Sequence, residues 1–184
     1  KQSKKHINIE NQYIIDNIPD YNSKKILNFG LGDIGKNTCK NILEYTSNNN
    51  VTLINRTLEK VLDFKETHPN VIVKDYSSLE EEIIETDILV VSTGSNLPTI
   101  TPEHLKKDHP ILILDLSMPE NVDISVKDIP GVTLINVDEL SKITDETLAI
   151  RKQEVPFAEA IIKKHKEDFN EWLNHRRFTP AINA

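Results

Sequence analysis

Short apolar runs alternate along this chain with longer stretches in which apolar positions recur at a helical period. The runs are rich in Ile, Val and Leu at nearly every position, which predicts strands covered on both faces, as in a parallel sheet. The predicted strands are Ile26–Phe29, Val51–Ile54, Val71–Val73, Ile88–Val91, Ile111–Leu114 and Val132–Ile135. The predicted helices between them are Ile34–Thr46, Leu58–Thr67, Leu79–Glu85 and Pro102–Lys107.

This alternation of strand and helix predicts right-handed βαβ units. We therefore expect an α/β fold over residues 24–150, a Rossmann-like doubly wound parallel sheet. Residues 1–23 are polar and are predicted to be a connecting segment, in which Tyr13–Ile15 could be the last turns of a helix. Residues 151–184 are predicted to be a C-terminal helical extension.

An apolar stripe marks the helix predicted from Asp138 to about Arg177. Its members recur at steps of three and four residues: Ala158, Ile161, Ile162, His165, Phe169, Trp172 and Leu173. Phe169 and Trp172 fit a helix interface better than a ligand site. Pro156 lacks a backbone N–H, so we expect a break or kink of this helix near Glu154–Val155.

Composition narrows the class of protein. The 184 residues carry a net charge of −7, which argues against generic nucleic-acid binding. A single cysteine excludes a disulfide framework and a cysteine-based zinc site. No apolar run approaches the roughly 18 residues of a membrane span, so we expect no membrane segment and a cytoplasmic location. The chain begins at Lys1 and its only methionine is Met118, which indicates a piece of a longer protein.

The strongest chemical signal is a glycine-rich turn, Gly30-Leu31-Gly32-Asp33-Ile34-Gly35. It follows a predicted strand and opens a predicted helix, the context in which G-x-G-x-x-G binds a dinucleotide. Gly30 would allow the tight turn, Gly32 the close approach of the pyrophosphate, and Gly35 the close packing of helix on strand. The helix N-terminus would offer unpaired N–H groups to the phosphates. The alternative is a structural turn without a ligand.

A second signal, Asn55-Arg56-Thr57 followed by Lys60, ends the second predicted strand. An NAD site usually has an acidic residue here to bind the ribose hydroxyls. A guanidinium instead matches a phosphate monoester, so Arg56 favours NADPH over NADH. In the alternative interpretation Thr57 caps the following helix and Arg56 is merely solvated.

Two further loops are expected at the same edge of the sheet. Ser92, Thr93 and Gly94 follow the fourth strand, which should neighbour the first, and would let the nicotinamide half lie against the loop. Asp115 follows the fifth strand, with Pro119 in the same loop, and these two are the candidate substrate-side residues. Whether Asp115 orients a substrate or only caps a turn stays open.

No residue of the chain is expected to be catalytic or to bind a metal. Cys39 lies on the face of the first predicted helix that carries apolar residues, so it is interpreted as a packing residue and not a nucleophile. The six histidines show no paired spacing that would suggest metal ligands.

Together these motifs resemble the NADPH-binding domain of glutamyl-tRNA reductases over about residues 24–180. General dinucleotide-binding blocks carry part of the resemblance: Lys25–Leu27, Gly30–Gly35, Asn55–Thr57, Glu59–Lys60, Asp87–Gly94 and Leu114–Pro119. More specific are the block Asn136-Val137-Asp138-Glu139-Leu140 and, after it, Arg151, Phe157–Ile162 and Phe169–Leu173. One position departs from the family pattern, because Glu120 stands where an arginine is common.

The resemblance implies an NADPH-dependent oxidoreductase of tetrapyrrole (haem) biosynthesis, which reduces glutamyl-tRNA to glutamate-1-semialdehyde. The resemblance implies three domains, and the thioester-forming cysteine would belong to an N-terminal catalytic domain that we expect to be missing here. Residues 151–184 would lead toward the C-terminal dimerisation domain. Cys39 does not match that motif, so the chain would bind NADPH but be inactive alone. The resemblance further implies glutamyl-tRNA binding through the missing domain, a homodimer of the full protein, and an aminomutase partner for the product.

Two alternatives stay open. A shikimate-type NADP-dependent dehydrogenase also pairs a glycine-rich turn with an Asn-Arg-Thr phosphate site, although the block 136–140 and the long terminal helix argue against it. A non-catalytic nucleotide-binding or docking module would instead use the C-terminal apolar stripe as its working surface.

Overall fold

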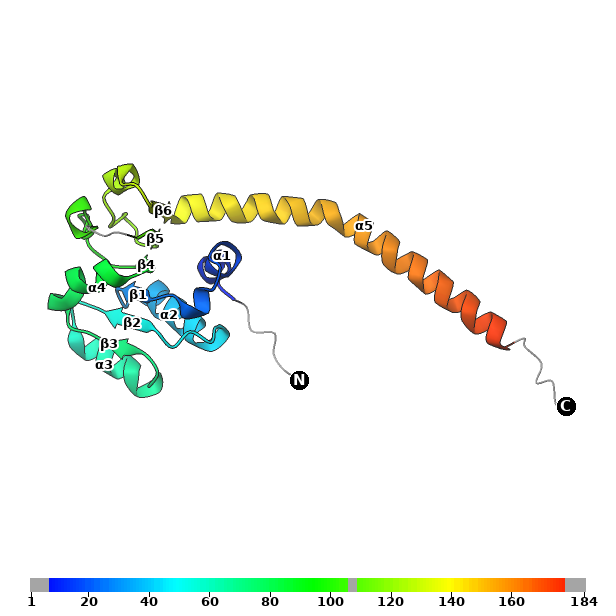
Figure 1. Ribbon diagram of the computed structural model, residues 1–184, viewed down its shortest axis with the longest axis horizontal. Coiled ribbons are helices and arrows are strands. Elements are labelled where there is room, and N and C mark those ends of the chain that lie inside the picture. Colours follow the sequence, from blue (N-terminus) through cyan, green and yellow to red (C-terminus); the bar gives the residue numbers. More distant parts are fainter. Residues whose placement is uncertain (1–6, 106–108, 178–184) are drawn as a thin grey trace. The chain divides into compact units, whose positions relative to one another are not determined.

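The six strands form one parallel sheet in the order β3-β2-β1-β4-β5-β6, which confirms the predicted doubly wound α/β fold (Figure 1). The strands are β1 Ile26–Phe29, β2 Val51–Ile54, β3 Ile72–Val73, β4 Ile88–Val91, β5 Ile111–Asp115 and β6 Val132–Asn136. The order reverses where β1 lies between β2 and β4. Ligands of such sheets bind at this point, beyond the carboxyl ends of the strands.

This computed structural model describes residues 7–105 and 109–177. Its α-helices are α1 Ile9–Asn17, α2 Asp33–Tyr45, α3 Leu58–Thr67, α4 Leu79–Glu85 and α5 Val137–Arg177. Its short 3-10 turns are Tyr21–Ser23, Tyr76–Ser78, Pro102–His104 and Ile124–Asp128. The helix predicted over Pro102–Lys107 is therefore only a 3-10 turn as far as it is described, and its residues 106 and 107 lie outside the described residues.

The strands are apolar at nearly every position because two cores flank the sheet. Ile26 packs into one core together with Cys39 and Ile42 of α2. Leu27 and Phe29, whose side chains alternate with those of Ile26 and Asn28, pack into the other. Every residue of β1, β2, β4 and β5 is buried, as the sequence pattern predicts.

Helix α1 packs on α2. Ile14 is 2% exposed and belongs to the core that contains α2. Asn11 Nδ2 donates to the Thr38 carbonyl oxygen at 3.2 Å, and Thr38 Oγ1 donates to Glu10 Oε1 at 2.7 Å. The described part of the predicted connecting segment is thus folded against the sheet domain. The boundary between this segment and the sheet domain at residue 23 stays a prediction.

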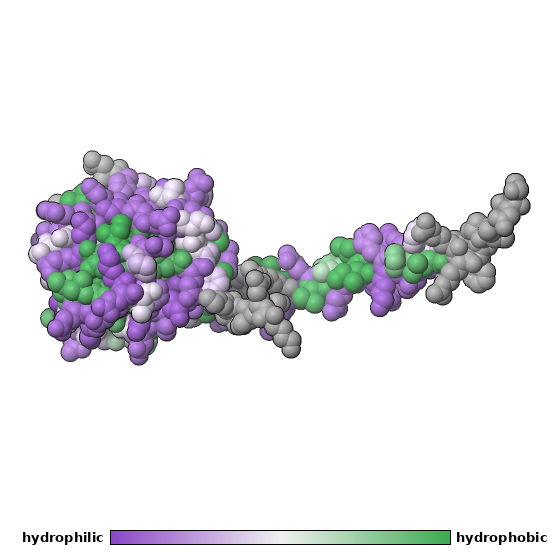
Figure 2. All heavy atoms as spheres, turned by 90° about the horizontal axis from the view of Figure 1, so that it is seen from below, coloured by the Kyte–Doolittle hydropathy of each residue, from purple (hydrophilic) through white to green (hydrophobic). Residues whose placement is uncertain are grey.

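The chain separates into two units, residues 1–141 and 142–184. The second unit consists, in its described part, of α5 beyond its first turns. This helix is continuous through Pro156, so of the expected break or kink the break does not occur. A proline removes one hydrogen bond of the helical ladder, and the remaining bonds of a 41-residue helix continue on both sides of it. Figure 2 shows exposed apolar side chains along this helix between hydrophilic ones.

Candidate functional site

A cavity of about 240 Å³ opens beyond the carboxyl ends of β1, β2 and β4. Nine residues that the sequence singled out line it: Leu31, Gly32, Asn55, Arg56, Thr57, Lys60, Ser92, Thr93 and Gly94. The other candidate residues, Gly30, Asp33, Ile34, Gly35, Asp115 and Pro119, lie outside its wall. Three loops far apart in the sequence therefore meet around one space, as the predicted strand order requires.

Two glycines of the turn are required by the fold itself. Gly30 has φ +107°, a conformation that side chains disfavour, and a Cβ there would overlap the Ser92 carbonyl group. A Cβ on Gly35 would overlap Ser92 Oγ and the Gly30 carbonyl oxygen. Ser92 Oγ also donates to that oxygen at 3.2 Å. The close contact between the turn, α2 and β4 thus explains Gly30 and Gly35 without any ligand.

Two other glycines have no such structural reason. Gly32 has φ −68°, and a Cβ there would lie 3.7 Å from its nearest neighbour, the Ser92 carbonyl oxygen. A Cβ on Gly94 would meet nothing within 4 Å. Both residues line the cavity, so a side chain at either position would enter open space at its wall. A ligand that approaches the backbone closely accounts for glycine at these positions.

The charged residues of the cavity wall are both cations, Arg56 and Lys60. Both are exposed, and neither makes an ion pair within the part of the chain that the structure describes. The start of α2 lies at the same cavity through Gly32, its N-cap residue, which supplies no side-chain cap. Unpaired N–H groups and two cations together favour a ligand with phosphate groups.

Asn55 holds the glycine turn to the start of α3. Its Oδ1 accepts from the Leu31 N–H at 3.2 Å, and its Nδ2 donates to the Thr57 carbonyl oxygen at 3.1 Å. Thr57 occupies the N-cap position of α3, but its side chain makes no capping hydrogen bond. The cap alone therefore does not explain the Asn55-Arg56-Thr57 motif.

Asp115 caps its own loop. It is 1% exposed, and its Oδ1 accepts from the Ser117 N–H at 3.0 Å. Its Oδ2 accepts from the N–H groups of Asn121 and Val122 at 2.7 and 2.8 Å. Both carboxylate oxygens are thus engaged within the loop, which favours the turn-capping interpretation. Pro119, whose peptide bond to Met118 is cis, lines a separate cavity of about 370 Å³ with Ser117 and Glu120.

Asn121 is an important residue that the sequence analysis missed. Its amide joins the loop after β4 to the loop after β5, through Thr93 and Ser95 on one side and Pro119 on the other. An asparagine in a polar loop gives no local signal. The neighbouring positions of β4 and β5 in the sheet were the only available indication that these loops meet.

The interpretation of Cys39 as a packing residue is confirmed. The side chain is fully buried, and this burial raises the pKa of its thiol to about 12. A protonated, inaccessible thiol is a poor nucleophile. Within the described ranges, no group of His, Cys, Asp and Glu side chains could hold a metal ion.

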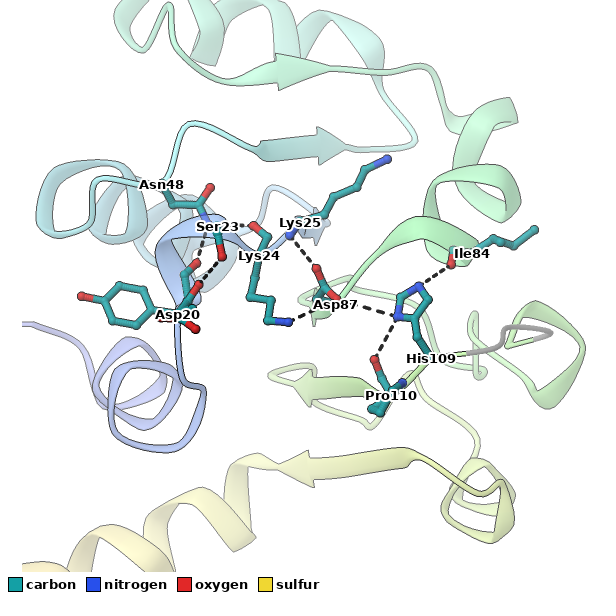
Figure 3. Close-up of polar contacts among 10 residues, drawn as sticks. Asp20, Ser23, Lys24, Lys25, Asn48, Ile84, Asp87, His109 and Pro110 are labelled. Atoms are coloured by element: carbon teal, nitrogen blue, oxygen red, sulfur yellow. Dashed lines mark hydrogen bonds and ion pairs between the residues drawn. The ribbon is translucent and has the colours of Figure 1, made fainter.

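A larger cavity, of about 710 Å³, lies at the opposite edge of the sheet, among residues that precede the strands. Its polar wall centres on Asp87 (Figure 3). Asp87 Oδ2 accepts from the Lys25 N–H at 2.9 Å, and Oδ1 lies 3.9 Å from Lys24 Nζ and 3.7 Å from His109 Nδ1. His109 Nε2 lies 3.1 Å from the Ile84 carbonyl oxygen. These contacts link α4, β1 and the start of β5, which is a structural role.

A doubly wound parallel sheet with a glycine-rich turn and a cationic cavity at its switch point defines the class of nucleotide-binding α/β domains. The sequence model of the shikimate/quinate 5-dehydrogenase family matches residues 13–143. The chain belongs to this family.

Curated relatives confirm the resemblance to glutamyl-tRNA reductases. The chain is 53% identical over 173 residues to glutamyl-tRNA reductase 2 of Flavobacterium johnsoniae, and 47% identical over 173 residues to the glutamyl-tRNA reductase of Flavobacterium psychrophilum. These matches include 94% of this chain but only 40% and 42% of the two relatives. The chain thus spans less than half the length of the relatives it matches.

Solved structures share the fold. The glutamyl-tRNA reductase of Methanopyrus kandleri matches 95% of this chain and 47% of its own, with a TM-score of 0.71 and 24% identity. The nucleotide-binding domain of the Thermoplasma volcanium enzyme matches 80% of this chain and 99% of its own, with a TM-score of 0.61 and 22% identity. Among the described helices, none is long and apolar enough to cross a membrane.

Proposed function

We propose that this chain is the NADPH-binding domain of a glutamyl-tRNA reductase, an enzyme that reduces glutamyl-tRNA to glutamate-1-semialdehyde in tetrapyrrole biosynthesis. One observation carries the cofactor assignment. Gly32 and Gly94 need not be glycine for the fold, yet both line the cavity that also contains two cations. A purely structural turn would explain Gly30 and Gly35 but neither of these.

The residues of the cavity wall would bind different parts of the cofactor. Arg56 and Lys60 would bind the 2′-phosphate that distinguishes NADPH from NADH. Gly32 and the first N–H groups of α2 would bind the pyrophosphate, since a helix N-terminus attracts anions. Thr93 and Gly94 would contact the nicotinamide half. When bound, the cofactor supplies the hydride for the reduction.

The same proposal explains what the chain lacks. Cys39 is buried with a raised pKa, so it cannot form the thioester that the reaction needs. The cysteine that forms the thioester would instead belong to the remainder of the protein, which would also bind glutamyl-tRNA. We therefore expect this chain to bind NADPH and to show no reductase activity alone. A cytoplasmic location, a homodimer and an aminomutase partner for the product belong to the same proposal.

Thermal unfolding with and without nucleotides tests the cofactor assignment. At about 100 times its Kd, a ligand of the folded state adds roughly 2.7 kcal/mol, or about 5–10 °C for a chain of this size. We expect this shift with NADPH and NADP⁺ and a smaller one with NADH. Arg56→Ala should abolish most of the difference between NADPH and NADH, because it removes the fork that binds the phosphate.

Lys65→Ala is the matched control, because it removes one positive charge from the exposed face of α3, the helix that follows Arg56, outside the cavity wall. It should leave all shifts unchanged. Equal shifts with NADPH and NADH would contradict the assignment of Arg56, and no shift with any nucleotide would favour the docking-module alternative.

A further inference from the structure

We propose that Asn121 is a positioning residue, which holds the loop after β4 in the conformation that binds the nicotinamide half of NADPH. This inference rests on the proposed function. The two loops involved are residues 92–97, here called the β4 loop, and residues 116–122, here called the β5 loop.

The side chain of Asn121 is completely buried, and both the nitrogen and the oxygen of its amide form hydrogen bonds. Nδ2 donates to the Ser95 carbonyl oxygen at 2.8 Å and to the Pro119 carbonyl oxygen at 2.9 Å. Oδ1 accepts from the Ser95 N–H at 3.2 Å and from the Thr93 hydroxyl. Both hydrogens and both lone pairs therefore have partners, which only an amide of this orientation can provide.

The backbone of Asn121 is itself held by the end of strand β5. Asp115, the last residue of β5, accepts from the Asn121 and Val122 N–H groups, as described above. Ser117 Oγ accepts from the Thr93 N–H at 3.1 Å and so adds a second tie between the loops. A rigid strand end thus fixes Asn121, and Asn121 fixes Thr93 and Ser95.

This arrangement acts on one wall of the cavity only. Thr93 and Gly94 line the cavity from the β4 loop, whereas Arg56 and Lys60 line it from the segment after β2. Each of the contacts given for the Asn121 side chain goes to the β4 or β5 loop. Loosening Asn121 should therefore weaken binding of the part of the cofactor that reaches the β4 loop, and leave the phosphate end intact.

Asn121→Asp tests this directly. The carboxylate has the same shape, but it cannot donate to the Ser95 and Pro119 carbonyl oxygens and would face them with negative charge. We would titrate the protein with NADPH and with adenosine 2′,5′-bisphosphate, which has the adenosine 2′-phosphate end but no nicotinamide. The Kd for NADPH should rise about tenfold or more from the two lost hydrogen bonds, while the Kd for the bisphosphate stays within about twofold.

Asn96→Asp is the matched control, because it introduces the same charge at an exposed position of the β4 loop that lies outside the cavity wall. It should leave both Kd values unchanged. Ser117→Ala, outside the cavity wall, removes only the hydroxyl that accepts from the Thr93 N–H in the second tie between the loops, and it should raise the Kd for NADPH selectively and by a smaller factor. This second variant keeps the test decisive where Asn121→Asp does not fold.

Equal weakening of both ligands, or of neither, would overturn the role of Asn121, since a general loss of folded protein affects both ends alike. The proposed function fails in a different way. In that case the unmodified protein itself binds neither NADPH nor the bisphosphate.

Discussion

At the scale of single residues, chemically identical glycines have different reasons to be present. Gly35 is enclosed by Ser92 and by the Gly30 carbonyl group, whereas Gly32 faces open space at the cavity. A sequence motif cannot separate these cases, because the difference is in the surroundings and not in the residue. Substitution by alanine should separate them, since it adds only one methyl group.

Gly35→Ala should lower the free energy of unfolding by about 1–3 kcal/mol, as overpacking does in a closed site. Gly32→Ala should change it by less than about 1 kcal/mol, because its backbone conformation suits alanine. Gly32→Ala should nevertheless raise the Kd for NADPH about tenfold or more. Urea unfolding and fluorescence titration of both variants would check this. A fully stable Gly32→Ala variant with unchanged affinity would exclude close approach of the cofactor to Gly32.

At the scale of elements, the block Asn136–Leu140 explains how α5 begins. Asn136 Oδ1 accepts from the Glu139 N–H at 2.9 Å, and Glu139 Oε2 accepts from the Asn136 N–H at 3.1 Å, which is a reciprocal capping box. Lys127 Nζ donates to Glu139 Oε1 at 2.6 Å, and Leu140 is buried in the core of the sheet domain. The block that is most specific to the resemblance thus ties the first turn of α5 to the sheet domain.

Asn136→Ala should cost about 1 kcal/mol of stability, because it removes the cap acceptor for the first turn of the helix. The midpoint of thermal unfolding should fall by about 2–4 °C. Glu139→Gln keeps an oxygen that can accept from the Asn136 N–H, so it should cost less than about 0.5 kcal/mol. A loss for Glu139→Gln as large as that for Asn136→Ala would show that the charge of Glu139, and not the capping box, stabilises this end.

At the scale of the whole molecule, the second unit contains an exposed apolar stripe. Phe157, Ile161, Ile162, Phe169 and Trp172 are each at least 50% exposed, and the rings of Phe169 and Trp172 stack at 5.8 Å. The spacing of the stripe is that of one helix face. Exposure of such a face to water is unfavourable, and contact with another apolar surface would remove it from water.

Sedimentation velocity tests whether a second copy of this chain covers the stripe. We expect self-association at micromolar concentration, and Phe169→Asp should shift the protein toward the monomer, because it places a charge in the apolar contact. Asn170→Asp adds the same charge about 100° further around the helix and should leave association unchanged. A protein that is monomeric at all concentrations would exclude α5 alone as the dimer contact.

The sequence by itself determined the sheet and nine residues of the cavity wall. Strands covered on both faces must be apolar throughout, and parallel strands must place their following loops at one edge, so pattern and order were enough. Only the tertiary structure decided the role of Asp115, the contacts of Asn121 and the continuity of α5 through Pro156. Buried hydrogen bonds between the β4 and β5 loops depend on the exact approach of two irregular segments, which no local periodicity encodes. The tolerance of a proline likewise depends on the helix that surrounds it.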